Sequence, residues 1–242
     1  MYSIKTDGLT KKYKDVVAVD GLSLSVEAGE LYSLLGINGA GKTTTIKMLS
    51  TLTEPTSGDA FINGKSIVTE GYEVKRMIAV SPQETAVAPN LSVEENLRFI
   101  CGIYGFSREK TEDKIKEMSE LLGLSAVSGR RAGKLSGGWQ RRLSIAMALI
   151  AEPEVLFLDE PTLGLDVIAR SELWDIIRSL RGRITVVLTT HYMEEAEKLS
   201  DHIGIMKNGR LLISDTPENI KAYAHTDDFE AAFVKIVKEA AR

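Results

Sequence analysis

The residues best suited to chemistry lie in one glycine-rich segment that runs from Gly36 to Thr43. They fit the pattern G-x-x-x-x-G-K-[ST], which predicts a loop that binds the phosphates of a nucleotide. Backbone N–H groups of the loop can turn toward phosphate oxygens, Lys42 can reach the β- and γ-phosphates, and the Thr43 hydroxyl is placed for Mg²⁺. We expect nucleotide contacts from Gly36, Ile37, Asn38, Gly39, Ala40, Gly41, Lys42, Thr43 and Thr44. The alternative, a glycine-rich turn that binds nothing, is disfavoured because an apolar strand precedes the loop and a helix follows it.

Two adjacent carboxylates form the second chemical feature. Asp159 and Glu160 come directly after the apolar residues 155–158, which are typical of a strand buried on both faces of a parallel sheet. In such sheets ligands bind at the carboxyl ends of the strands, where the phosphate loop also opens. Asp159 is therefore expected to hold Mg²⁺ beside Thr43, and Glu160 to orient and deprotonate the water that attacks the γ-phosphate. The alternative is a pair of solvated carboxylates at the start of a loop.

Apolar patterning predicts the strands and helices that position these groups. Strands are expected at residues 2–7, 16–26, 30–35, 60–62, 77–80, 155–158, 184–188, 203–206 and 211–213. Asn63-Gly64 and Asn208-Gly209 are typical of tight hairpin turns. A helix over 43–52 leaves the phosphate loop, and a helix over 168–180 is the crossover of a βαβ unit. An apolar helical stripe over 229–240 is expected to pack in the core or at an interface.

Between residues 91 and 151 the pattern changes from strands to helices. Ser92 and Glu95 form a capping box at the start of the first helix. Gly123 closes the second helix, and the third begins near Gly138. Because the strands resume immediately afterwards, we interpret this region as a compact helical insert and not as a separate domain.

Composition restricts the class of protein. The chain has 242 residues, 43% of them hydrophobic and 26% charged, which is ordinary for a soluble globular protein. Its net charge of −4 argues against a nucleic-acid partner. The single cysteine, Cys101, excludes an internal disulfide and a Cys-based zinc site, and is expected to be a small buried residue. The start of the sequence lacks a signal-peptide pattern, and no apolar run is long enough to span a bilayer, so we expect a cytoplasmic protein.

The segment Leu135 to Trp139, Leu-Ser-Gly-Gly-Trp, resembles the Leu-Ser-Gly-Gly-Gln signature of the ATP-binding cassette family. The family landmarks stand in the family order: Tyr13, the phosphate loop, Gln83, the signature, Asp159-Glu160, the segment Leu163 to Asp166, and His191. The resemblance covers essentially the whole chain. It implies one α/β P-loop NTPase domain over residues 1–242, with a central mostly parallel sheet, an N-terminal antiparallel β subdomain and a helical subdomain inserted at about residues 85–151.

The resemblance also implies roles for residues that are not distinctive alone. Tyr13 matches the aromatic residue that stacks on adenine, although by itself it could be an ordinary sheet residue. Gln83 matches the glutamine that touches Mg²⁺ and the attacking water and senses the membrane partner. His191 matches the histidine that contacts the γ-phosphate, a position where a structural histidine is the alternative. Asp166 matches a loop that contacts the second subunit, but it could equally be a helix N-cap.

The signature has a physical rationale of its own. Ser136, Gly137 and Gly138 precede a helix, so their N–H groups and the Ser136 hydroxyl form a second anion-binding terminus. In the family this terminus completes the site of a partner cassette, with two ATP molecules held head to tail. The resemblance therefore implies a homodimer, or a dimer with a related ATPase subunit. Trp139 departs from the family pattern, which has glutamine there.

Taken together, the residues and the resemblance predict an ATPase subunit that uses ATP and Mg²⁺ to power a membrane transporter. We expect an integral-membrane permease on a separate chain, and a peripheral position on the cytoplasmic face of the membrane. The sequence around Arg141 to Ala146 and the short tail resemble exporter ATPases more than importer ATPases. One rival is a soluble cassette ATPase of translation or DNA maintenance, which usually carries a second cassette or a long coiled coil. The other is a non-catalytic nucleotide-gated scaffold, against which Glu160 argues.

Overall fold

A computed structural model describes residues 1–240 of the chain, and its centre is a mostly parallel sheet. The strand order is β11-β10-β4-β9-β8-β7, with β10, β4, β9, β8 and β7 parallel and β11 antiparallel at one edge. The strands are β4 (Leu31–Leu35), β7 (Ile78–Ser81), β8 (Val155–Asp159), β9 (Thr185–Thr190), β10 (His202–Lys207) and β11 (Arg210–Asp215). The expected α/β fold with a mostly parallel sheet is confirmed.

A smaller antiparallel sheet contains the N-terminal strands, as expected. It has the order β2-β1-β5-β6, and β3 pairs with β1. Its strands are β1 (Tyr2–Tyr13), β2 (Val16–Leu22), β3 (Ser25–Glu27), β5 (Ser57–Ile62) and β6 (Lys65–Ser66). The prediction of one strand over 16–26 is wrong, because this segment forms two strands, β2 and β3. β1 has a positive φ of 58° at Gly8, and its first half pairs with β3 whereas its second half pairs with β2. β1 also continues past residue 7, so that Tyr13 is its last residue.

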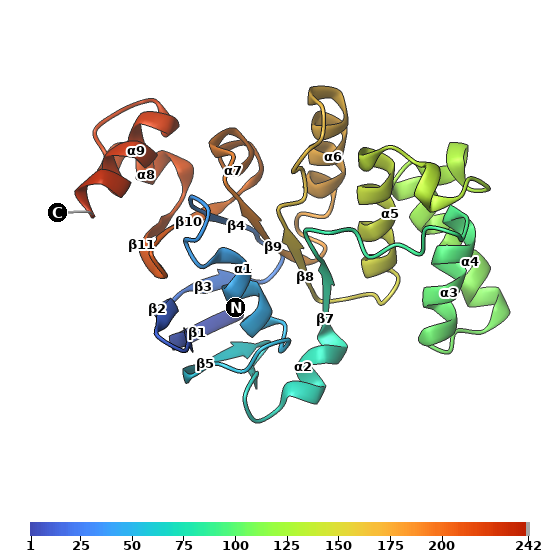
Figure 1. Cartoon of the computed structure of the whole chain (residues 1–242), viewed down its shortest axis with the longest axis horizontal. Helices are drawn as coiled ribbons and strands as arrows, with labels where there is room; N and C mark the ends of the chain where they lie inside the picture. Colours follow the sequence, from blue (N-terminus) through green and yellow to red (C-terminus); the bar gives the residue numbers. More distant parts are fainter. Residues whose placement is uncertain (241–242) are drawn as a thin grey trace.

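The two faces of the central sheet are buried against different layers. On β8, Val155 and Phe157 pack with α1 (Lys42–Leu49) and the N-terminal sheet, whereas Leu156 and Leu158 pack with helices on the other face. Figure 1 shows α1 between the two sheets. Because both faces are covered, the strand is apolar throughout and its start and end are rigidly held. Residues at its carboxyl end are thus well placed to form a site.

The helical region contains α3 (Val93–Ile103), α4 (Arg108–Leu121) and α5 (Gly137–Leu149), which lie together beyond β7 and β8 (Figure 1). The predicted capping box is confirmed, since the Glu95 N–H donates to Ser92 Oγ at 3.1 Å and the Ser92 N–H to Glu95 Oε2 at 2.7 Å. Gly123, with φ 67°, follows α4 as expected. Cys101 is fully buried in the core that these helices share with one face of the central sheet.

Some short helices were not predicted: α2 (Gly71–Met77), α7 (Met193–Leu199) and α8 (Pro217–Tyr223). The crossover helix α6 (Val167–Ser179) and the tail helix α9 (Phe229–Glu239) agree with the expected periodicity. The apolar stripe of α9 packs against Ile203 and Ile205 of β10, so it belongs to the core. Over residues 1–240, no helix is both long and apolar enough to cross a membrane.

Candidate functional site

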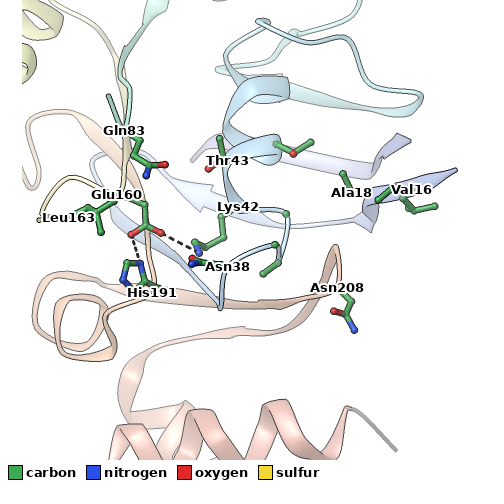
Figure 2. A pocket seen from close by; sticks show the side chains of 15 residues that line it. Val16, Ala18, Asn38, Lys42, Thr43, Gln83, Glu160, Leu163, His191 and Asn208 are labelled. Carbon is green, nitrogen blue, oxygen red and sulfur yellow. Dashed lines mark hydrogen bonds and ion pairs between the residues drawn. The ribbon is translucent and has the colours of Figure 1, made fainter. Parts of the chain in front are cut away.

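The phosphate loop connects the end of β4 to the start of α1, as the pattern predicts. Gly41 caps α1 with φ 103°, and a Cβ there would lie 2.5 Å from the Ala18 carbonyl oxygen. Only glycine fits this position, because a side chain would be strained and would collide with backbone. The loop lies along a cavity of about 740 Å³. Its lining consists of Val16, Val17, Ala18, Asn38, Gly39, Ala40, Gly41, Lys42, Thr43, Thr44, Gln83, Glu160, Leu163, His191 and Asn208 (Figure 2).

Lys42 is the cation of the cavity. Its side chain is 6% exposed, and its ammonium donates to the Gly36 carbonyl oxygen at 2.6 Å. The same Nζ lies 3.3 Å from Glu160 Oε1. A buried charge needs partners, and these two hold the ammonium at the mouth of the loop. It is therefore positioned to bind a phosphate that enters between the loop and Glu160.

A second cluster joins the loop to the end of β8. Thr43 Oγ1 donates to Asp159 Oδ1 at 3.1 Å, and Thr189 Oγ1 donates to the same oxygen at 2.5 Å. Among the residues the structure describes, no group of three or more His, Cys, Asp or Glu side chains could form a metal cage. A carboxylate beside a hydroxyl instead suits Mg²⁺, which keeps several waters and takes its other ligands from substrate phosphates. The oxygen donors of Thr43 and Asp159 thus fit the predicted metal site.

The predicted base and the predicted histidine are in direct contact. His191 Nδ1 lies 2.8 Å from Glu160 Oε2, and Figure 2 shows Glu160 between His191 and Lys42. A carboxylate only accepts hydrogen bonds, so Nδ1 is the donor. The Glu160 backbone, with φ 48°, donates to the Thr189 carbonyl at 3.2 Å and to Thr189 Oγ1 at 3.0 Å. Glu160 is therefore fixed at both backbone and side chain, as a general base requires.

Gln83 lines the same cavity from the loop after β7. This loop is held by a residue that the sequence did not single out, Arg141 of α5. The Arg141 guanidinium donates to the Pro82 carbonyl at 2.6 Å and to the Gln83 carbonyl at 2.5 Å. Burial lowers the pKa of Arg141, and the charge of Asp159 opposes this shift. The loop that carries Gln83 is thereby tied to the helix that begins at the signature.

Tyr13 lies apart from the cavity wall formed by Val16 and Val17. Its ring is 44% exposed at the end of β1, and the Lys11 ammonium lies 5.1 Å from the ring centroid. Tyr13 and the adjacent aliphatic residues therefore present an open apolar surface beside the phosphate loop. This surface is available to a flat ring system bound next to the phosphates.

The signature does not line this cavity. Ser136 is the exposed N-cap of α5, and within the described residues its side chain makes no capping hydrogen bond. A Cβ on Gly138 would lie 3.2 Å from the Ala169 Cβ, so glycine allows α5 to approach α6 closely. Asp166 Oδ1 accepts from the Ala169 N–H at 2.9 Å, which confirms the N-cap interpretation of Asp166. The donors at Ser136 and Gly137 are thus presented on a surface separate from the phosphate loop.

Trp139, the residue that departs from the family pattern, is partly buried. Its ring packs against the core of the helical region, and the Arg142 guanidinium carbon lies 4.9 Å from its centroid. Arg142 also forms an ion pair with Glu172 of α6. The neighbouring Gln140 amide donates to the Ala132 carbonyl at 3.1 Å. Trp139 therefore packs against the helical-region core, beside the Arg142–Glu172 ion pair that joins α5 to α6.

Comparisons with known proteins identify the family of the chain. A family model described as "ABC transporter" matches residues 19–163. The probable multidrug ABC transporter ATP-binding protein YbhF of Escherichia coli K12 is 39% identical over 242 residues, which is 98% of this chain and 42% of that protein. The Nod factor export ATP-binding protein I of Burkholderia lata is 42% identical over 209 residues, covering 86% of this chain and 68% of that protein. The chain therefore belongs to the ABC transporter family.

A solved structure shows the same fold. It is a dimeric, post-hydrolysis structure of an ATP-binding cassette bound to ADP and Pi. The two chains superpose with a TM-score of 0.79 at 26% identity, over 88% of this chain and 98% of the other. The chain spans less than half the length of the Escherichia coli relative.

Proposed function

We propose that this chain is an ATP-hydrolysing subunit that drives an export transporter, acting as a dimer with two ATP molecules between the subunits. The observation that carries the proposal is the cavity in which Lys42 and Thr43, which bonds Asp159, meet the Glu160–His191 pair. A general base beside a phosphate-binding loop and a magnesium-binding pair is the arrangement that phosphoryl transfer to water requires. A scaffold that only binds nucleotide has no need of the base.

Each residue then has a part in hydrolysis. The N–H groups of residues 36–44 and the Lys42 ammonium bind the phosphates, and Tyr13 stacks on the adenine ring. Thr43, Asp159 and Gln83 hold Mg²⁺, which when bound neutralises the charge of the β- and γ-phosphates. Glu160 takes a proton from the attacking water.

His191 has a double role in this proposal. Its Nδ1–H holds the Glu160 carboxylate in orientation, and its Nε2 faces the γ-phosphate. The neighbouring Tyr192 ring, with its centroid 4.2 Å from that of His191, restricts the imidazole to this position. The base is thus oriented before substrate binds, which lowers the cost of reaching the transition state.

The dimer follows from the separation of the two anion-binding surfaces. The cavity holds the phosphate loop and the base, whereas Ser136, Gly137 and Gly138 are presented elsewhere on the subunit. A second subunit, identical or related, brings its own signature and its Asp166 segment to this cavity. The γ-phosphate is then enclosed by donors from both chains.

The transporter assignment rests on the names of the relatives, which describe ATP-binding proteins of multidrug and Nod factor export transporters. An integral-membrane permease on a separate chain would bind this subunit at the cytoplasmic face of the membrane. Co-expression with its permease should bring the chain into the membrane fraction and raise its ATPase rate. A chain that stays soluble and unstimulated would favour a soluble ABC-family ATPase instead.

The dimer is tested by the dependence of hydrolysis on protein concentration. Purified protein should be mostly monomeric without nucleotide, and its specific activity should rise as its concentration rises, because each site needs a partner. A specific activity that stays constant in a verified monomer would refute the composite site. The measurement needs only phosphate release and light scattering on the same samples.

A further inference from the structure

Behind the Glu160–His191 pair lies a buried carboxylate that the proposed hydrolysis does not use. Glu195, in the first turn of α7, is fully buried. Its Oε1 accepts from the Thr162 hydroxyl at 2.8 Å and from the Trp174 indole N–H at 3.0 Å. Its other oxygen, Oε2, has no hydrogen-bond partner among the described residues. A buried carboxylate is costly, so its presence here calls for a function.

Glu195 and its two partners come from three segments near the catalytic pair. Thr162 lies two residues after Glu160, in the loop that leaves β8. Trp174 belongs to α6, and Glu195 itself follows His191 by four residues. The contacts close a ring: Glu160 bonds to His191, the chain runs from His191 to Glu195, and Glu195 bonds to Thr162. Glu195 thus joins the segment that carries Glu160 to the segment that carries His191.

The electrostatic surroundings agree with a carboxyl group that is held by its hydrogen bonds and not by an ion pair. Burial raises the pKa of Glu195, the nearby polar side chains of Thr190, Thr162 and Trp174 oppose this, and the charge of Glu160 raises it further. The facing cation is Arg141, which interacts with Glu195 through charge alone. Oε1, which accepts both hydrogen bonds, therefore carries the structural role.

We propose that Glu195 is a positioning residue for ATP hydrolysis, which fixes the distance between Glu160 and His191 by joining the loop at Thr162 to α7. The inference rests on the proposed ATPase function. Because the ring lies behind the cavity, losing Glu195 should alter the orientation of the base and leave the phosphate loop unchanged. A small displacement of a catalytic group costs rate more than binding.

The test compares four variants by ATPase kinetics and thermal melting. Glu195→Ala should lower kcat about tenfold or more and change KM for ATP less than about twofold. Glu195→Gln keeps the oxygen that Thr162 and Trp174 bond, so its kcat should stay within about threefold of wild type. Glu194→Ala removes an exposed neighbour paired with Lys198 and should behave as wild type. Leu199→Ala, which removes buried apolar volume from the same helix, should lower the melting temperature without lowering kcat.

Two outcomes would overturn the inference: a Glu195→Ala kcat equal to wild type, or Glu195→Gln as impaired as Glu195→Ala. If Glu195→Ala does not fold, Thr162→Val removes the same bond with little change in volume and should lower kcat about threefold or more at unchanged KM. Wild-type kcat in folded Thr162→Val would then refute the proposal. Wild-type protein that hydrolyses no ATP would instead refute the proposed function, so the two failures are distinguishable.

Discussion

Replacing Glu160 with glutamine removes the charge of the proposed base and keeps its shape. Glu160 contacts Lys42 at 3.3 Å through Oε1 and His191 at 2.8 Å through Oε2. The glutamine carbonyl oxygen can keep one of these contacts, but an amide cannot take a proton from water. We expect kcat to fall by about 10²-fold or more, which is about 2.7 kcal/mol of transition-state stabilisation. ATP affinity should change little, because the loop and Lys42 are intact.

Glu160→Gln also lowers the free energy of unfolding, independently of its effect on kcat. It removes half of a nearly buried ion pair, a loss that can cost about 3–5 kcal/mol when the remaining charge has no other partner. Lys42 keeps the Gly36 carbonyl at 2.6 Å, and the cavity is open to solvent, so about 1–2 kcal/mol is expected. For a chain of this size that lowers the melting temperature by roughly 2–8 °C. The protein stays folded, and the rate loss is chemical.

The assay measures phosphate release, ATP affinity and dimer content for Glu160→Gln beside a matched control. Glu154→Gln is that control, because Glu154 precedes the same strand at its other end and bonds Asn63 there. The control should hydrolyse ATP at the wild-type rate, whereas Glu160→Gln should bind ATP and accumulate as a dimer. Hydrolysis by Glu160→Gln within about threefold of wild type would remove Glu160 from its role as base.

Other substitutions test the remaining parts of the site. Lys42→Ala should abolish ATP binding in a fluorescence titration, and unchanged affinity would contradict the role of Lys42. Trp139→Gln should change kcat/KM by less than about tenfold, since the donors of the signature are backbone groups and a hydroxyl, whereas Ser136→Arg should abolish hydrolysis; equal losses would make the tryptophan catalytic. Burial raises the pKa of Glu195 in the folded protein above its ordinary 4.5, so the folded state binds the proton more tightly than the unfolded state does. The contribution of this group to stability therefore falls as the pH rises through the folded-state pKa. The melting temperature of Glu195→Gln relative to wild type should therefore increase as the pH rises above about 4.5, and a constant difference would refute this sign.

The sequence predicted those elements whose pattern is set by burial on both faces. Residues 155–158 and 184–188 are continuous apolar runs because helices and a second sheet cover the two faces of β8 and β9. The three short helices that were missed have only seven residues each, too few to display a period of 3.6. The length of β1 was also missed, because residues 8–13 are largely polar and are held by pairing with distant strands.

The site residues that belong to local sequence motifs were predicted. The residues that join the site only through tertiary contacts were missed. The phosphate loop and Asp159-Glu160 have local patterns, and the structure brings Glu160 into the cavity of the loop and Asp159 into contact with Thr43. Thr189 was not predicted, because a threonine at the end of a strand has no distinctive sequence signal, yet it bonds both Asp159 and the Glu160 backbone. Glu195 stands in an acidic segment that is typical of a solvated helix face. It is buried only because Thr162 and Trp174, distant in sequence, fold onto it.

The most direct test of the composite ATP site is to mix two inactive variants. Lys42→Ala has a defective phosphate loop and an intact signature, whereas Ser136→Arg has the reverse. In a mixed dimer one of the two sites receives the intact loop and the intact signature, so the mixture should hydrolyse ATP although neither variant does so alone. A mixture as inactive as its components, with mixed dimers verified, would contradict the shared site.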